Sequence, residues 1–192
     1  MTTASGPAEA VRLRSPGDVV RAVSTLLGFH PVESVVIVGL QAGHPPRRVG
    51  PVLRADLPGT AEDSVAWAAQ LISAVPTHPH LAAVVVITLA ERVPGHVWPL
   101  LRAGFAYLDL PLQAGIHAES TQPGAAWQCL CDDPACSAAG VLGSETTALE
   151  THAVVAGQVR YATRAHWVAA GRPGHPNDTD PNNTGPAARR TR

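Results

Sequence analysis

Two short runs of β-branched residues constrain the fold of this chain more than any other feature. The first spans residues 34–40 (SVVIVGL) and the second spans residues 81–89 (LAAVVVITL). Because successive side chains of a strand point to opposite faces of a sheet, a strand that is apolar at every position must be covered on both faces. The two runs therefore predict the central strands of an α/β sheet that has helices on both sides.

A helix is predicted directly before the first of these strands. Ser15 fits the N-cap, Pro16 the first helical position and Asp18 the third. Apolar residues then recur at helical spacing as far as Leu27, and Gly28 is a typical C-terminal stop. Further helices are expected at about 61–75, 95–108 and 145–156, with a short amphipathic segment at about 161–169.

Three further strands are expected, at about 48–57, 110–119 and 126–131. The first of them contains Pro51, which has no amide donor, so this strand belongs at a sheet edge or a bulge. Its short loop to the strand at 33–40 predicts an antiparallel pair, whereas the helix before 81–89 predicts parallel neighbours joined by a right-handed crossover. The resulting prediction is an α/β fold: a single domain with a mixed, mostly parallel sheet of about five strands and helices on both faces.

Length and charge limit the organisation and the partners of the chain. Its 192 residues correspond to about one domain, which we expect over residues 12–170, between a disordered N-terminus (1–11) and a disordered polar tail (171–192). The net charge of −1 offers no attraction for nucleic acid or an anionic membrane. Neither a secretory signal nor a membrane-spanning apolar run is recognisable, so we expect a cytoplasmic location.

Cys129, Cys131 and Cys136 form the one cluster that suggests chemistry. On a strand the first two point to the same face, and an Asp-Asp-Pro turn could return Cys136 toward them. If the hairpin pairs odd-numbered with odd-numbered residues, His117 joins them and completes a tetrahedral zinc site. If odd-numbered residues pair with even-numbered ones, the cysteines face the core and this site disappears.

Two other interpretations of the cysteines stay open. The thiols can serve as small buried apolar groups. Alternatively, one of them can act as a nucleophile in a thiol-dependent hydrolase, which requires a histidine nearby. His117, His152 and His166 are all available for that role, and the sequence does not select among them.

A second candidate site is the loop Gly28-Phe29-His30-Pro31, between the first helix and the first strand. Loops at the end of a sheet can form a pocket, and His30 could act there. The alternative is a structural histidine that is held by a backbone hydrogen bond.

Several separated motifs occur in a recognisable order along the chain. They are Arg14-Ser15-Pro16, Leu27-Gly28-Phe29-His30-Pro31, the segment 34–40, and Trp127 with Cys131-Asp132-Asp133-Pro134-Ala135-Cys136. Over about residues 12–170 the chain thereby resembles the actinobacterial family of unknown function numbered 4192. Members of that family often carry a double cysteine and a proline where this chain has Cys136-Ser137-Ala138, and they are usually longer. The resemblance implies a cytosolic protein without established activity, and it supplies no catalytic residues.

Few residues of the chain lack a structural explanation, and the expected function follows from this observation. Apolar stripes and turns account for most of the chain, so we expect a protein that binds a small-molecule ligand or a protein partner without catalysis. The alternatives are a small metal- or thiol-dependent hydrolase that uses Cys129, Cys131, Cys136 and His117, and a structural module in which zinc ties the hairpin to its loop.

Overall fold

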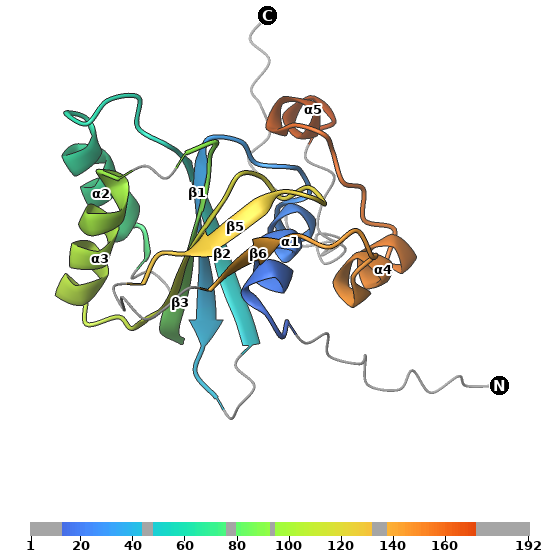
Figure 1. The fold of residues 1–192 in the computed structure, drawn as a ribbon, viewed down its shortest axis with the longest axis horizontal. Coiled ribbons are helices and arrows are strands. Elements are labelled where there is room, and N and C mark those ends of the chain that lie inside the picture. The colour runs from blue at the N-terminus through green and yellow to red at the C-terminus, as the bar shows by residue number, and fades with distance from the viewer. Residues whose placement is uncertain (1–12, 44–47, 76–79, 93–94, 132–137, 172–192) are drawn as a thin grey trace, which may run out of the picture.

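The fold is built around one β-sheet. The structure, a computed structural model, describes residues 13–43, 48–75, 80–92, 95–131 and 138–171. Within these residues six strands form a single sheet in the order β2-β1-β3-β4-β5-β6 (Figure 1). The strands are β1 (Ser34–Gln41), β2 (Arg48–Asp56), β3 (Leu81–Leu89), β4 (Leu112–Ala118), β5 (Ala126–Cys129) and β6 (Ala139–Val141).

The two β-branched runs form central strands of the sheet, as predicted, and these strands, β1 and β3, are neighbours. They pair antiparallel, with Ile37 opposite Val86 and Ser34 opposite Leu89. Residues 35–38 and 84–87 are all buried. Full burial on both faces explains why these segments are apolar at consecutive positions rather than at alternating ones.

The prediction of a mostly parallel sheet is wrong. Only β3 and β4 pair parallel, and the other four neighbouring pairs are antiparallel. β2 and β3 do run in the same direction, but β1 lies between them, so the expected crossover between adjacent strands does not exist. An apolar pattern on both faces of a strand indicates that the strand is buried. It does not indicate whether the neighbouring strands run parallel or antiparallel to it.

The edges of the sheet explain two other outcomes. β2 is an edge strand, as Pro51 predicted, and its pairing with β1 is irregular between Val38 and Leu40. At the opposite edge lies β6, which brings the count to six strands instead of about five. Its sequence Ala139-Gly140-Val141 is too short to show the alternation by which a strand is recognised.

Helices cover both faces of the sheet. The helices are α1 (Pro16–Leu27), α2 (Ser64–Ser73), α3 (Val97–Tyr107), α4 (Ala148–Val155) and α5 (Arg164–Ala169). α1 packs on the face that carries Val36 and Ile87, which we call the α1 face. α2 and α3 pack on the face that carries Ile37 and Val86, the α2/α3 face. Figure 1 shows α2 and α3 on one side of the sheet and α1 with α4 on the other.

The ends of α1 follow the sequence signals. The Ser15 hydroxyl accepts a hydrogen bond from the Asp18 amide at 3.1 Å, and the Asp18 carboxylate accepts one from the Ser15 amide at 3.0 Å. Gly28 ends the helix with φ of 76°, a left-handed conformation that glycine adopts without strain. No described helix has the length and apolar character needed to cross a membrane.

The second half of β4 is buried at four consecutive positions, although apolar residues alternate with polar or small ones along it, as is typical of a half-exposed strand. Trp98 of α3 covers Gly115, where an added Cβ would lie 1.9 Å from the indole ring. The neighbouring His117 is only 5% exposed. A polar-looking strand face is therefore closed by a tryptophan that fits because residue 115 has no side chain.

Replacing Gly115 with alanine should therefore destabilise the protein. The new methyl group would displace the Trp98 ring, and we expect the free energy of unfolding to fall by about 1–3 kcal/mol. Gly59→Ala is the matched control, because its added Cβ meets nothing within 4 Å, so stability should stay within about 0.5 kcal/mol. Urea denaturation of both variants makes the comparison, and equal stabilities would contradict the packing described here.

Candidate functional site

Several polar residues lie at the edge of the sheet where β3 and β4 end and β1 begins, which we call the carboxyl edge. β3 is followed by Ala90, Glu91 and Arg92, while Glu33 directly precedes β1. These segments meet because Ser34 pairs with Leu89 at the last position of the ladder. In open α/β sheets, ligands commonly bind outside the carboxyl ends of parallel strands. The carboxyl edge is therefore the first place to seek a binding site.

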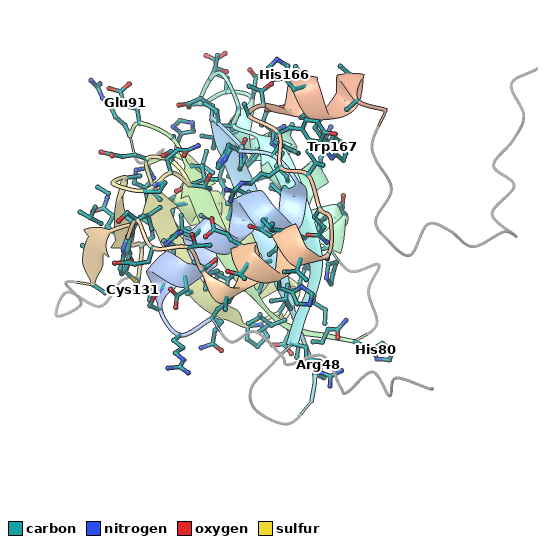
Figure 2. The ribbon with its side chains drawn as sticks, turned by 90° about the vertical axis from the view of Figure 1, so that its right-hand side faces the viewer. Arg48, His80, Glu91, Cys131, His166 and Trp167 are labelled. Carbon is teal, nitrogen blue, oxygen red and sulfur yellow. The ribbon has the colours of Figure 1, made fainter. Side chains whose placement is uncertain are left out.

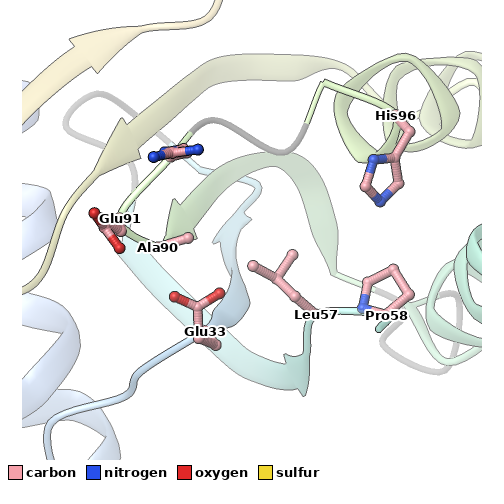
Figure 3. A pocket seen from close by; sticks show the side chains of 7 residues that line it. Glu33, Leu57, Pro58, Ala90, Glu91 and His96 are labelled. Carbon is pink, nitrogen blue, oxygen red and sulfur yellow. The ribbon is translucent and has the colours of Figure 1, made fainter. Parts of the chain in front are cut away.

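An open cavity of about 490 Å³ lies at this edge, toward the α2/α3 face (Figure 3). This volume is within the range of about 300–1,000 Å³ that small-molecule sites occupy. The cavity is lined by Glu33, Leu57, Pro58, Ala90, Glu91, Arg92 and His96. It thus combines two carboxylates, a guanidinium and an imidazole with apolar surface.

Glu33 occupies this cavity with an unusual backbone conformation. Its φ is 42°, in the left-handed region that a residue with a side chain enters at a cost of roughly 1–2 kcal/mol. Its neighbours fix that conformation. The Glu33 carbonyl accepts a hydrogen bond from the Leu57 amide at 2.8 Å. The buried Ser34 hydroxyl donates to the Val32 carbonyl at 2.6 Å.

Arg54 adds a second restraint on Ser34. Its guanidinium donates to the Ser34 hydroxyl from two nitrogens, at 2.7 and 3.0 Å, and it also forms an ion pair with Asp56. The start of β1 is therefore tied to β2 by side chains as well as by the ladder. These contacts fix the backbone from which the Glu33 side chain projects at the cavity.

Within the part of the chain that the structure describes, the carboxylates and the guanidinium of the cavity have no ion-pair partners. Among the described residues, neither Glu33 nor Glu91 forms an ion pair, and the same is true of Arg92. Figure 3 shows Glu33 and Glu91 near one another at one end of the cavity and His96 at the other. Unpaired charges of both signs beside apolar surface are available to a bound molecule.

His117 lies buried close to these carboxylates. Its Nδ1 is 3.1 Å from the Thr88 hydroxyl. Burial lowers the pKa of the imidazole, while the negative charges of Glu119 and Glu33 oppose that shift. Because burial dominates, His117 is a neutral imidazole at neutral pH.

The register of the β4–β5 hairpin decides where the expected zinc ligands lie. Cys129 is opposite Ile116, and His117 is opposite Gln128. This is the odd-with-even pairing, so Cys129 faces the α1 side of the sheet and His117 faces the α2/α3 side. A metal site that uses the cysteines would thus need a fourth ligand other than His117.

The zinc hypothesis stays a prediction when the other two cysteines are considered. Cys131 is exposed and its amide donates to the Cys129 sulfur at 3.3 Å, whereas Cys136 lies outside the described residues. In the described part of the chain, no three His, Cys, Asp or Glu side chains converge as metal ligands would. Figure 2 shows Cys131 well away from Glu91, so this thiol does not belong to the cavity.

The loop Gly28-Phe29-His30-Pro31 contacts the C-terminal segment of the chain. Phe29 is buried, and its ring centroid lies 5.6 Å from that of Trp167. The Tyr161 amide donates to the Gly28 carbonyl at 2.8 Å, and the His30 amide donates to the Tyr161 carbonyl at 3.3 Å. These contacts give the loop a structural role in joining α1 to the segment that contains α5.

The His30 side chain takes part in the same junction. Its Nδ1 lies 2.7 Å from the Thr121 hydroxyl, so a side chain rather than a backbone group holds the ring. Burial and the nearby Arg160 guanidinium lower the pKa of His30, and the Glu150 carboxylate opposes them. The imidazole is therefore neutral at neutral pH.

Glu150 fastens the C-terminal segment to α1. Its carboxylate accepts hydrogen bonds from Arg21 at 2.7 Å, from Arg160 at 2.8 Å, and from the Thr147 amide and hydroxyl at 2.8 and 2.9 Å. Burial alone would raise the pKa of Glu150. The hydrogen bonds from Arg160 and Thr147 and the charge of Arg21 outweigh it and lower the pKa to about 2.

The comparison with protein-family models agrees with the motifs seen in the sequence. The model of a domain of unknown function, DUF4192, matches residues 16–192. The chain belongs to this family. The match confirms the resemblance and extends past residue 170, while the actinobacterial origin stays a prediction. Searches of curated proteins and of solved structures gave no significant match to this DUF4192 chain.

Sequence reasoning missed the cavity residues of this DUF4192 protein. A signal was present, because Glu91 and Arg92 come directly after the end of a buried strand and Glu33 comes directly before one. The start of β1 and the end of β3 meet only because these two strands are neighbours in the sheet. The sequence does not show which strands are neighbours. His96 begins the turn into α3 and has no motif around it.

Replacing Glu150 with glutamine should loosen the C-terminal segment of the DUF4192 chain. We expect the free energy of unfolding at pH 7 to fall by about 1–3 kcal/mol, since Arg21 loses the charged partner of a largely buried ion pair. Because the folded-state pKa of Glu150 is lowered, its contribution is complete above pH 4.5 and is lost as pH falls toward 2.

Denaturant unfolding at several pH values measures this contribution. Glu145→Gln is the control, because Glu145 is an exposed residue of the same segment. A stability difference between wild type and Glu150→Gln that persisted undiminished at pH 2 would contradict this assignment.

Proposed function

We propose that this protein binds a small-molecule ligand in the cavity at the carboxyl edge and does not catalyse a reaction there. The cavity has the volume of a ligand site, and its wall combines Leu57 and Pro58 with the charged side chains of Glu33, Glu91 and Arg92. Apolar surface supplies affinity, and a few placed charges supply orientation and specificity.

The conformation of Glu33 is the observation that carries the proposal. At φ of 42°, glycine or asparagine would be the residues expected on backbone grounds alone. The chain instead has a glutamate, whose carboxylate has no ion-pair partner in the described structure. A strained backbone that presents an unpaired charge to a cavity is a common feature of ligand sites.

Covalent catalysis through a hydroxyl or a thiol gains no support from the cavity lining. Among the described lining residues there is no serine, threonine or cysteine that could act as a nucleophile. The thiols proposed for a hydrolase include Cys129, which belongs to the α1 face, and the cavity opens toward the α2/α3 face. The thiol-dependent hydrolase therefore receives no support from the cavity.

Replacing Glu33 with glycine should separate stability from binding. Glycine relieves the left-handed strain but gains freedom in the unfolded chain, so the free energy of unfolding should stay unchanged or rise by up to about 1 kcal/mol. Ligand binding should fall because the carboxylate is gone. A thermal-shift screen of small polar compounds on the wild-type protein identifies ligands, since a molecule that binds the folded state raises Tm.

Asp109→Gly is the matched control. Asp109 has φ of 52° in the turn after α3 and does not line the cavity. This variant should match Glu33→Gly in stability and keep the full ligand-induced shift. If ligands raised Tm equally in Glu33→Gly and in wild type, they would bind elsewhere and the proposal would fail.

A further inference from the structure

We infer that the ligand is a small zwitterion, namely a free α-amino acid with an apolar side chain. This inference rests on the proposed function and names the class of molecule that the cavity takes. The signs of the lining charges, the position of the two carboxylates and the apolar surface beside them support it.

The lining carries charges of both signs. Glu33 and Glu91 contribute two carboxylates and Arg92 contributes a guanidinium. A ligand with only positive charge would pair with the carboxylates and leave Arg92 unpaired, and an anion would pair with Arg92 and leave both carboxylates unpaired. Each mismatch disfavours binding, because the ligand charge then lies beside a wall group of the same sign. A molecule that carries an ammonium and a carboxylate satisfies both kinds of wall group.

The two carboxylates suit an ammonium group. Figure 3 shows Glu33 and Glu91 at the same end of the cavity with Ala90 beside them. An ammonium has three N–H donors and can bond to two separate carboxylates at once. The ligand carboxylate would then bond to Arg92, whose planar guanidinium matches a carboxylate with two parallel hydrogen bonds.

A metal ion fits this lining less well than an ammonium. An ion needs several ligand atoms converging at about 2.0–2.6 Å. In the described part of the chain no group of three His, Cys, Asp or Glu side chains converges in that way, so the two carboxylates do not have His96 as a third ligand. Hydrogen bonds from an ammonium tolerate wider spacing.

The apolar surface indicates the side chain of the amino acid. Leu57 lies between the acidic end of the cavity and Pro58 in Figure 3. An aliphatic or aromatic side chain attached next to the ammonium would extend over these residues and remove apolar surface from water. The cavity volume of about 490 Å³ admits such a molecule.

Calorimetric titration of the full chain with three related probes tests the inference. The probes are L-leucine, L-leucinamide, which lacks the carboxylate charge, and N-acetyl-L-leucine, which lacks the ammonium charge. We expect L-leucine to bind with a dissociation constant on the order of 1 mM, as suits a small ligand in an open site. Each analogue should bind roughly tenfold more weakly or worse, because it lacks one of the two charges that pair with the cavity wall.

Variants assign each end of the ligand to its partner. Glu91→Gln should weaken L-leucine roughly tenfold. Arg92→Gln should weaken L-leucine to the level of L-leucinamide, so that the protein no longer distinguishes the two. Glu62→Gln and Arg48→Gln are the controls, because these exposed residues do not line the cavity, and neither should change the affinity.

The outcomes separate the inference from the proposed function. If L-leucinamide binds as tightly as L-leucine, the ligand is a cation and the inference is overturned, while ligand binding by the cavity stands. If no probe binds but the thermal-shift screen yields other ligands that depend on Glu33, the inference again fails alone. If neither experiment yields a ligand that depends on the cavity, both are overturned.

Discussion

The antiparallel pairing of β1 with β3 is the constraint on which the rest of the structure depends. Its register, with Ile37 opposite Val86, decides which side chains face α1 and which face α2 and α3. A slip of one residue would exchange the two sets on β1, and the packing of both faces would be lost. Both strands are buried on both sides, so the pairing cannot be replaced by hydrogen bonds to water.

The same register positions the candidate site. Because Ser34 lies opposite Leu89, the residues just outside this pair, Glu33 and Ala90, come to lie at one edge of the sheet. The bond from the Leu57 amide to the Glu33 carbonyl adds the end of β2 to this edge. The cavity therefore depends on three chain segments that the central ladder aligns.

The two faces of the sheet have different roles at this edge. On the α2/α3 face, Trp98 covers Gly115, and His117 is buried as a neutral imidazole. On the α1 face, Glu150 and the contact of Phe29 with Trp167 fasten the C-terminal segment. The loop at Phe29 and His30 is accordingly a junction within the fold, and the cavity lies on the other face of the sheet.

Features of the fold that depend on consecutive residues could be predicted from the sequence, whereas features that depend on distant segments could not. Local signals were sufficient to predict the N-cap of α1 at Ser15, its end at Gly28 and the edge position of β2, which contains Pro51. The two-sided burial of residues 35–38 was also readable, because it appears in consecutive residues. Strand direction and hairpin register were not readable, since they arise from contacts between distant segments. The separation of His117 from Cys129 and the meeting of Glu33 with Glu91 both depend on those contacts.

The most direct test of a ligand site at the carboxyl edge is an amide chemical-shift titration of isotope-labelled protein with L-leucine. The account predicts that the amides of Glu33, Glu91 and His96 shift together and saturate with one dissociation constant, while those of Cys129 and Cys131 stay in place. Shifts centred on the cysteine hairpin or on α5, with Glu33 and Glu91 unmoved, would contradict it.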